Sequence, residues 1–141
     1  MTVYVDSSVL LRVVLAQPNA LHEWKQIKRG VSSELIATES LRTLDRHRLR
    51  AGFSDFEVAR RRKAILSTIA TLELIEIDTT VLERAARPMP TELATLDAIH
   101  LSSALIWQEL TGEDLVMATH DRALALGAQA HGMKVLGVAL S

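Results

Sequence analysis

The chain has 141 residues, of which 48% are hydrophobic and 23% charged, a balance typical of a folded domain and not of a disordered segment. Sixteen Lys and Arg residues stand against 17 Asp and Glu residues, so contact with nucleic acid would need a local basic patch. The absence of cysteine excludes disulfides and thiolate metal sites, and no apolar run reaches the roughly 20 residues that span a bilayer. We therefore expect a single domain over residues 1–141 that works in the cytoplasm, with no membrane partner.

Short apolar runs along the chain predict β-strands. The runs at residues 3–5, 74–77, 115–118 and 135–138 are β-branched or Leu-rich and lack strict alternation. Such runs are typical of strands covered on both faces in a parallel sheet. A fifth strand is predicted near residues 32–36.

Helical patterns lie between these runs. Ser54 and Glu57 have the spacing of a capping box, which predicts a helix that extends to about Leu72. The apolar positions of this helix include Phe56, Ala59, Ile65 and Ile69. A second helix ends at Gly112, and a shorter one over residues 122–131 ends at Gly132. One face of the second helix carries Leu96, Ile99, Ser103, Ile106 and Leu110. Strands that alternate with helices predict an α/β fold with a mainly parallel sheet of four to five strands.

Four acidic residues stand out against this pattern. Asp6 directly follows the first strand, and Asp121 lies three residues beyond the run that ends at Ala118. If these two strands are parallel neighbours, both aspartates project into one crevice at the carboxyl ends of the strands. Asp97 interrupts an apolar helix start, and Glu39 lies in another helical segment.

Carboxylates that converge on one point repel each other, and a divalent cation removes that penalty. Mg2+ and Mn2+ prefer such hard oxygen ligands, and they activate water and neutralise charge on a phosphodiester. The four acids therefore indicate phosphoryl chemistry. Each also has a simpler interpretation: Asp6 and Asp121 as helix caps, Glu39 as a solvated helix residue. Asp78 is interpreted as a cap only, whereas Asp97 is the hardest to explain structurally, because an unpaired charge among apolar residues is expensive.

The motifs that carry these acids resemble those of PIN-domain nucleases, and in particular the VapC-type toxins. The matching segments are residues 5–10 (VDSSVL), 38–42 (TESLR), 96–104 (LDAIHLSSA), 118–124 (ATHDRAL) and 132–136 (GMKVL). They follow the family's order along nearly the whole chain. The departures are small: Ser102 and Ser103 stand where Ala-Thr or Ala-Ser is frequent, and His120 precedes Asp121.

The resemblance implies a PIN-like three-layer α/β/α sandwich and an endoribonuclease that depends on Mg2+ or Mn2+. It also implies a VapB-type antitoxin as partner and a homodimer. Carried over by position, Asp6, Glu39, Asp97 and Asp121 form the acidic quartet, while Ser8 and Thr119 orient ligands or waters. Asp6 and Asp97 are expected to contact the metal most directly, and Asp121 through water. His100 and His120 are given no catalytic role.

RNA would need cations beside these acids. Arg42 and Arg46 follow Glu39 and are the preferred candidates, whereas the basic run at residues 60–63 is interpreted as a solvated helix face. Aromatic residues make up only 4% of the chain, which does not indicate an extended base-stacking platform. Trp24, Phe53 and Phe56 are expected to pack in the core, with an antitoxin groove or a dimer surface as the alternative.

Three other functional classes compete with the toxin interpretation. A phospho-acceptor receiver domain would need an acceptor Asp after a central strand and a Lys after a late one, and no Lys suits that position. A non-catalytic PIN-like module that binds RNA or protein is the closer rival, but all four acidic positions are filled. A PIN nuclease that serves RNA processing instead of acting as a toxin stays open.

Overall fold

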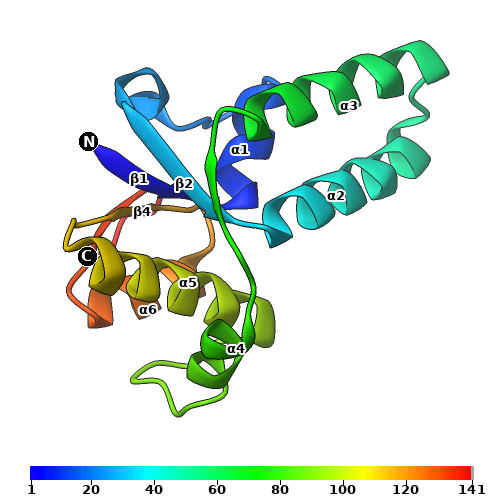
Figure 1. The fold of residues 1–141 in the computed structure, drawn as a ribbon. Helices are drawn as coiled ribbons and strands as arrows, with labels where there is room; N and C mark the ends of the chain where they lie inside the picture. Colours follow the sequence, from blue (N-terminus) through cyan, green and yellow to red (C-terminus); the bar gives the residue numbers. More distant parts are fainter. Residues whose placement is uncertain (141) are drawn as a thin grey trace.

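The computed structural model describes residues 1–140 and is built around a five-stranded sheet in which every neighbouring pair is parallel (Figure 1). The strand order is β3-β2-β1-β4-β5. The strands are β1 (Thr2–Val5), β2 (Arg29–Ser33), β3 (Glu73–Ile75), β4 (Val116–Ala118) and β5 (Lys134–Leu136). The helices are α1 (Ser7–Val14), α2 (Leu35–Ala51), α3 (Asp55–Ile69), α4 (Thr79–Ala85), α5 (Thr95–Thr111) and α6 (Arg122–Ala130), with a 3-10 helix at His22–Gln26.

The helices form two layers, one on each side of the sheet, as Figure 1 shows. Alternation along β1 sends Val3 and Val5 into a core with residues of α1, α2 and α3. Tyr4 points the other way, into a core with residues of α5 and α6 such as Leu101 and Leu124. The predicted α/β/α sandwich with a parallel sheet is therefore confirmed.

The fifth strand lies earlier than predicted. It covers Arg29–Ser33, and the chain is already helical from Leu35. This strand is central, paired with both β1 and β3, but Gly30 and two serines replace the apolar residues that normally reveal a buried strand. Gly30 faces Leu72 so closely that an added Cβ would lie 2.5 Å from its Cδ2 atom. The hydroxyl of Ser32 is satisfied by donating to the carbonyl of Val5 at 2.7 Å.

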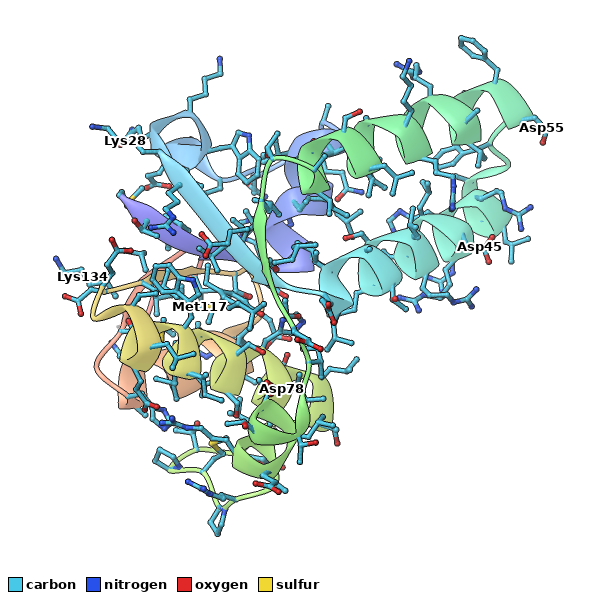
Figure 2. All side chains as sticks on the ribbon, in the orientation of Figure 1. Lys28, Asp45, Asp55, Asp78, Met117 and Lys134 are labelled. Carbon is cyan, nitrogen blue, oxygen red and sulfur yellow. The ribbon has the colours of Figure 1, made fainter. Side chains whose placement is uncertain are left out.

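The predicted signals for the start of α3 and the end of α5 are confirmed. The Ser54 side chain caps α3 by accepting from the backbone N–H of Glu57, and Gly112 ends α5 in the left-handed conformation. The expectation for Phe56 is wrong, because 77% of its surface is exposed. Phe56 belongs to the first turn of α3, beside Asp55 at the tip of the α2–α3 hairpin, where Figure 2 shows no sheet to cover it. Trp24 and Phe53 do pack against the core.

The predicted apolar face of α5 is buried only in its middle. Leu96 is 48% exposed and Leu110 is 82% exposed, whereas Ile99 and Ser103, in the middle of the same face, are buried. Within residues 1–140, no helix has the length and apolar character needed to cross a bilayer.

Candidate active site

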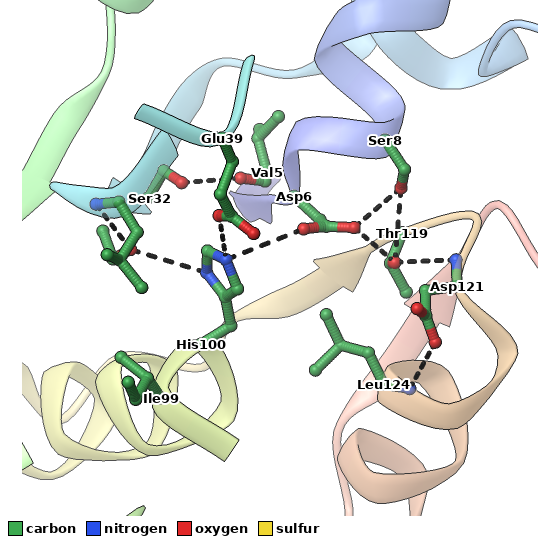
Figure 3. A network of polar contacts seen from close by, with 12 residues as sticks. Val5, Asp6, Ser8, Ser32, Glu39, Ile99, His100, Thr119, Asp121 and Leu124 are labelled. Atoms are coloured by element: carbon green, nitrogen blue, oxygen red, sulfur yellow. Dashed lines mark hydrogen bonds and ion pairs between the residues drawn. The ribbon is translucent and has the colours of Figure 1, made fainter. Parts of the chain in front are cut away.

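Asp6 lies at the carboxyl end of β1, beside the end of β4 in the same parallel pair. Its backbone N–H donates to the carbonyl of Ala118 at 3.0 Å, which fixes the two strand ends together. Asp6 occupies the N-cap position of α1, but its side chain makes no capping hydrogen bond. The carboxylate is instead buried, with 6% of the residue exposed, and faces the other polar groups in Figure 3.

Two hydroxyls hold the Asp6 carboxylate. Ser8 Oγ donates to Asp6 Oδ2 at 2.7 Å, and Thr119 Oγ1 donates to the same oxygen at 2.8 Å. Each hydroxyl also accepts from the backbone, Ser8 from the N–H of His120 and Thr119 from the N–H of Asp121, both at 3.0 Å. Because a hydroxyl has one proton to donate, both protons are used on Asp6, and Oδ1 is left for another partner.

We expect Thr119→Val to lower the free energy of unfolding by about 2 kcal/mol, because it removes one donor from buried Asp6 and the acceptor of the Asp121 N–H. Chemical denaturation monitored by circular dichroism measures this change. Thr68→Val is the matched control, since Thr68 donates only to a carbonyl within α3, and a change within about 0.5 kcal/mol is expected. Equal effects of the two substitutions would contradict the bridging role of Thr119.

Glu39 reaches the site from α2 and contacts His100 of α5. Its Oε1 lies 2.5 Å from His100 Nε2, and the same nitrogen lies 3.9 Å from Asp6 Oδ1. Burial of the ring lowers the pKa of His100, but the hydrogen bond and charge of Glu39, with Asp6 and Asp97, outweigh it and raise that pKa above its ordinary value.

Tyr4 contacts the other nitrogen of the His100 ring. Its hydroxyl lies 2.6 Å from His100 Nδ1, and both residues are buried. Burial, reinforced by the charge of Asp6, raises the pKa of the Tyr4 hydroxyl well above its ordinary value, so it keeps its proton. A contact absent from the sequence-based expectations thus joins β1, α5 and α2.

Asp97 lies half-buried in the first turn of α5. Burial and the charges of Asp121 and Asp6 raise the pKa of its carboxyl from 3.8 to about 6. The shift shows that the acids predicted from the motifs lie close enough to repel one another. The structure therefore brings Asp6, Glu39, Asp97 and Asp121 to one end of the sheet.

The simpler interpretation also holds for some of these residues. Asp121 caps α6, with Oδ1 accepting from the N–H of Leu124 at 3.0 Å, and Asp78 caps α4 in the same way. Asp121 is exposed, and its second carboxylate oxygen, Oδ2, takes no part in the cap. A cap and a site residue are compatible here, because the cap uses only Oδ1 of the carboxylate.

Arg42 and Arg46 lie on α2 beyond Glu39. Together with Ser7, Glu39 and Leu96 they line a groove of about 310 Å³. Arg42 is paired with Asp45 at 3.2 Å, whereas Arg46 forms no ion pair within residues 1–140 and donates only to the hydroxyl of Thr43. The structure thus places basic side chains beside the acids, with Arg46 the less neutralised of the two.

The donor set fits a hard divalent cation in chemistry, because carboxylate oxygens dominate it. Within residues 1–140, however, no three acidic or histidine side chains are arranged to hold one ion by themselves. Mg2+ commonly uses only one or two carboxylates and keeps several waters, so the arrangement suits an ion completed by water and substrate oxygens.

Comparison with known proteins relates this geometry to a family. The family model described as "PIN domain" matches residues 3–132. The chain belongs to the PIN-domain family. A curated relative, Ribonuclease VapC46 of Mycobacterium tuberculosis, is 34% identical over 138 residues, which cover 95% of each chain. The resemblance to VapC-type PIN proteins is confirmed.

Sequence reasoning about this PIN domain missed the Tyr4–His100 contact. The available signal was a tyrosine in an otherwise aliphatic strand and a histidine in an apolar helix segment directly after Asp97 and its two neighbours. Neither signal says that two residues so distant along the chain meet. His120 is a further case: its Nδ1 contacts the carbonyl of Gly137 at 2.9 Å and anchors the loop that carries Asp121.

Proposed function

We propose that this PIN-domain protein is a metal-dependent endoribonuclease that hydrolyses RNA phosphodiester bonds, and that it is the toxin of a toxin–antitoxin pair. The observation that carries the proposal is the gathering of four carboxylates at one end of the sheet, with the pKa of Asp97 raised to about 6. Groups with strongly shifted pKa values in a polar cluster mark functional sites. The family and a relative named as a ribonuclease support the same activity.

In this proposal Asp6 and Asp97 hold Mg2+ or Mn2+ directly, while Glu39 and Asp121 act directly or through bound water. The ion would supply Lewis acidity and lower the pKa of a bound water. Ser8 and Thr119 hold Asp6 through Oδ2, which would leave Oδ1 available to bind the ion. The acids repel each other in the metal-free protein, which favours occupation by a cation.

The groove beside Glu39 is proposed to receive the RNA backbone, with Arg46 as its main phosphate contact and Arg42 as a second one. Arg42 is partly neutralised by Asp45, so its contribution is smaller. Because the chain has a net charge of -1, these local cations, and no general basic surface, must provide the attraction.

We expect Arg46→Ala to weaken binding of single-stranded RNA by catalytically inactive Asp97→Asn protein and to lower the salt slope of log K by about 0.7. Filter binding across a series of KCl concentrations measures the slope. Arg62→Ala is the matched control, an exposed arginine on α3, and should leave the slope unchanged. Equal slopes for Arg46→Ala and the parent protein would show that Arg46 does not contact the RNA backbone.

Cleavage of total cellular RNA by purified, partner-free protein tests the activity. Discrete fragments are expected with Mg2+ or Mn2+, and none with a chelator or with Asp97→Asn. If folded wild-type protein and Asp97→Asn are equally inert with either metal, the enzyme proposal fails and a non-catalytic RNA- or protein-binding module replaces it.

The proposal includes partners and location. We propose a cytoplasmic protein that forms a homodimer, with one domain over residues 1–141, and a VapB-type antitoxin that neutralises it. An antitoxin that adds a helix to an apolar groove would fit the common mode of helix-in-groove recognition. Recovery of a small co-expressed protein that blocks RNA cleavage supports the toxin role, and a PIN nuclease that needs no such inhibitor would be an RNA-processing enzyme.

A further inference from the structure

His100 lies between two of the proposed metal-binding acids and is shielded from solvent. It is 1% exposed, and its Nε2 lies 2.5 Å from Glu39 Oε1 and 3.9 Å from Asp6 Oδ1. Figure 3 shows one nitrogen of the ring facing both carboxylates and the other nitrogen turned away from them. The ring therefore fixes where the Glu39 carboxylate lies relative to Asp6.

The donor and the acceptor of the His100–Glu39 hydrogen bond follow from which group carries the proton. An ionised carboxylate only accepts, so His100 Nε2 carries a proton and donates it to Glu39. In the neutral ring Nδ1 then accepts from the Tyr4 hydroxyl, 2.6 Å away. In the protonated ring Nδ1 donates to the oxygen of the same hydroxyl, so Tyr4 is its partner in both forms. The hydroxyl of Ser33 is 3.5 Å from the same nitrogen and is a weaker partner.

We propose that Tyr4 and His100 are positioning residues that hold the Glu39 carboxylate in place for the metal ion. This inference rests on the proposed metal-dependent function. Glu39 lies on α2, in a helix layer outside the sheet, whereas Tyr4 lies on the central strand β1. The Tyr4–His100–Glu39 chain therefore ties a carboxylate on α2 to the central strand of the sheet. Loss of such an outer hydrogen bond commonly weakens metal binding by about 10- to 100-fold.

The first test uses metal-free protein. Long-range 1H–15N spectra of 15N-labelled protein should show one imidazole whose proton is on Nε2 and exchanges slowly with solvent, assigned by its absence in His100→Gln. Tyr4→Phe keeps the aromatic ring and removes only the hydroxyl that is bonded to Nδ1 of His100. The Nε2 proton of His100 should then exchange at least about 10-fold faster, because the ring has lost one of its two hydrogen bonds. A wild-type ring protonated on Nδ1 alone, or equal exchange in Tyr4→Phe, overturns the inference.

The second test measures Mn2+ binding by electron paramagnetic resonance, without RNA. His100→Leu and Tyr4→Phe should raise the dissociation constant by about 10-fold or more. His100→Gln retains an N–H donor and should bind Mn2+ within about threefold of wild type. His131→Gln is the matched control, because the His131 ring bonds to the Gly127 carbonyl on α6, and it should bind as wild type does.

Failure of the positioning role and failure of the proposed metal-dependent activity would give different results. Wild-type affinity in folded Tyr4→Phe, or equal weakness of folded His100→Gln and His100→Leu, overturns the positioning role while leaving the ribonuclease proposal intact. If His100→Leu does not fold, Tyr4→Phe decides the question. If wild-type protein binds no Mn2+, the proposed metal dependence fails, and the proton-exchange measurement alone decides whether Tyr4 and His100 hold Glu39.

Discussion

Asp97→Asn is expected to abolish RNA cleavage and, in metal-free protein at pH 7, to make the fold more stable. The activity should fall by about 1,000-fold, equivalent to about 4 kcal/mol of transition-state stabilisation, because the proposed ion loses a direct carboxylate ligand. The stability gain has a separate cause. Burial and the charges of Asp121 and Asp6 make the ionised Asp97 carboxylate unfavourable in the folded state.

The pH dependence of this effect follows from the direction of the shift. The pKa of Asp97 is about 6 in the folded protein and near 3.8 when the chain is unfolded. Between these values the folded state binds more protons, so its stability falls as pH rises from about 4 to about 6. The cost is absent below pH 4 and complete above pH 6. Since Asp97 is half-exposed, screening reduces it to about 1 kcal/mol.

Thermal unfolding at pH 4 and pH 7 measures the stability difference. The Asp97→Asn protein should be more stable than wild type at pH 7 and similar to it at pH 4. Mg2+ should raise the melting temperature of wild type more than that of the variant, because binding to the folded state stabilises it. A variant that is less stable than wild type at both pH values would show that Asp97 is held by favourable contacts and not by repulsion.

Gly137→Ala is expected to lower the free energy of unfolding by about 3 kcal/mol and to reduce RNA cleavage. Gly137 follows β5 with a φ of +100°, and a Cβ there would lie 2.3 Å from the backbone oxygen of Thr119. Neither a backbone oxygen nor its strand can move aside cheaply, so strain at positive φ adds to a steric clash. Thr119 would be displaced, and its hydroxyl would no longer hold Asp6.

Gly52→Ala is the matched control for backbone strain alone. Gly52 ends α2 with a φ of +65°, and an added Cβ meets nothing within 4 Å. Its substitution should therefore cost only about 1 kcal/mol and leave cleavage unchanged. Urea denaturation and RNA cleavage by both variants measure the difference. If Gly137→Ala is no more harmful than Gly52→Ala, the close approach of residue 137 to Thr119 is not needed for the site.

Local sequence patterns determined much of the architecture. Near-continuous apolar runs predicted four of the five strands, and the Ser54 and Gly112 signals predicted helix ends, because periodicity and capping act over a few neighbouring residues. The positions of Asp6 and Asp121 after two such runs predicted that they would meet. That expectation needed one condition, a parallel β1–β4 pair, which the structure confirms.

Other features depended on contacts that no local pattern encodes. The sequence did not reveal β2 at its true register, because Gly30 and two serines occupy a strand that β1, β3 and the distant helix α5 bury. It assigned Phe56 to the core, although α3 carries that residue beyond the sheet.

For the acidic residues, too, the sequence determined one part and the tertiary structure the other. Residue types and strand ends singled out Asp6, Glu39, Asp97 and Asp121 along the chain, and the resemblance to VapC-type PIN proteins joined them as one candidate quartet. Only the tertiary structure decided that Asp121 caps α6, and that Asp6 is held by Ser8 and Thr119 instead. It alone joined Glu39 to Tyr4 through His100. The reason is physical: hydrogen bonding and charge repulsion depend on distances of a few ångströms between residues that lie up to 113 positions apart in sequence.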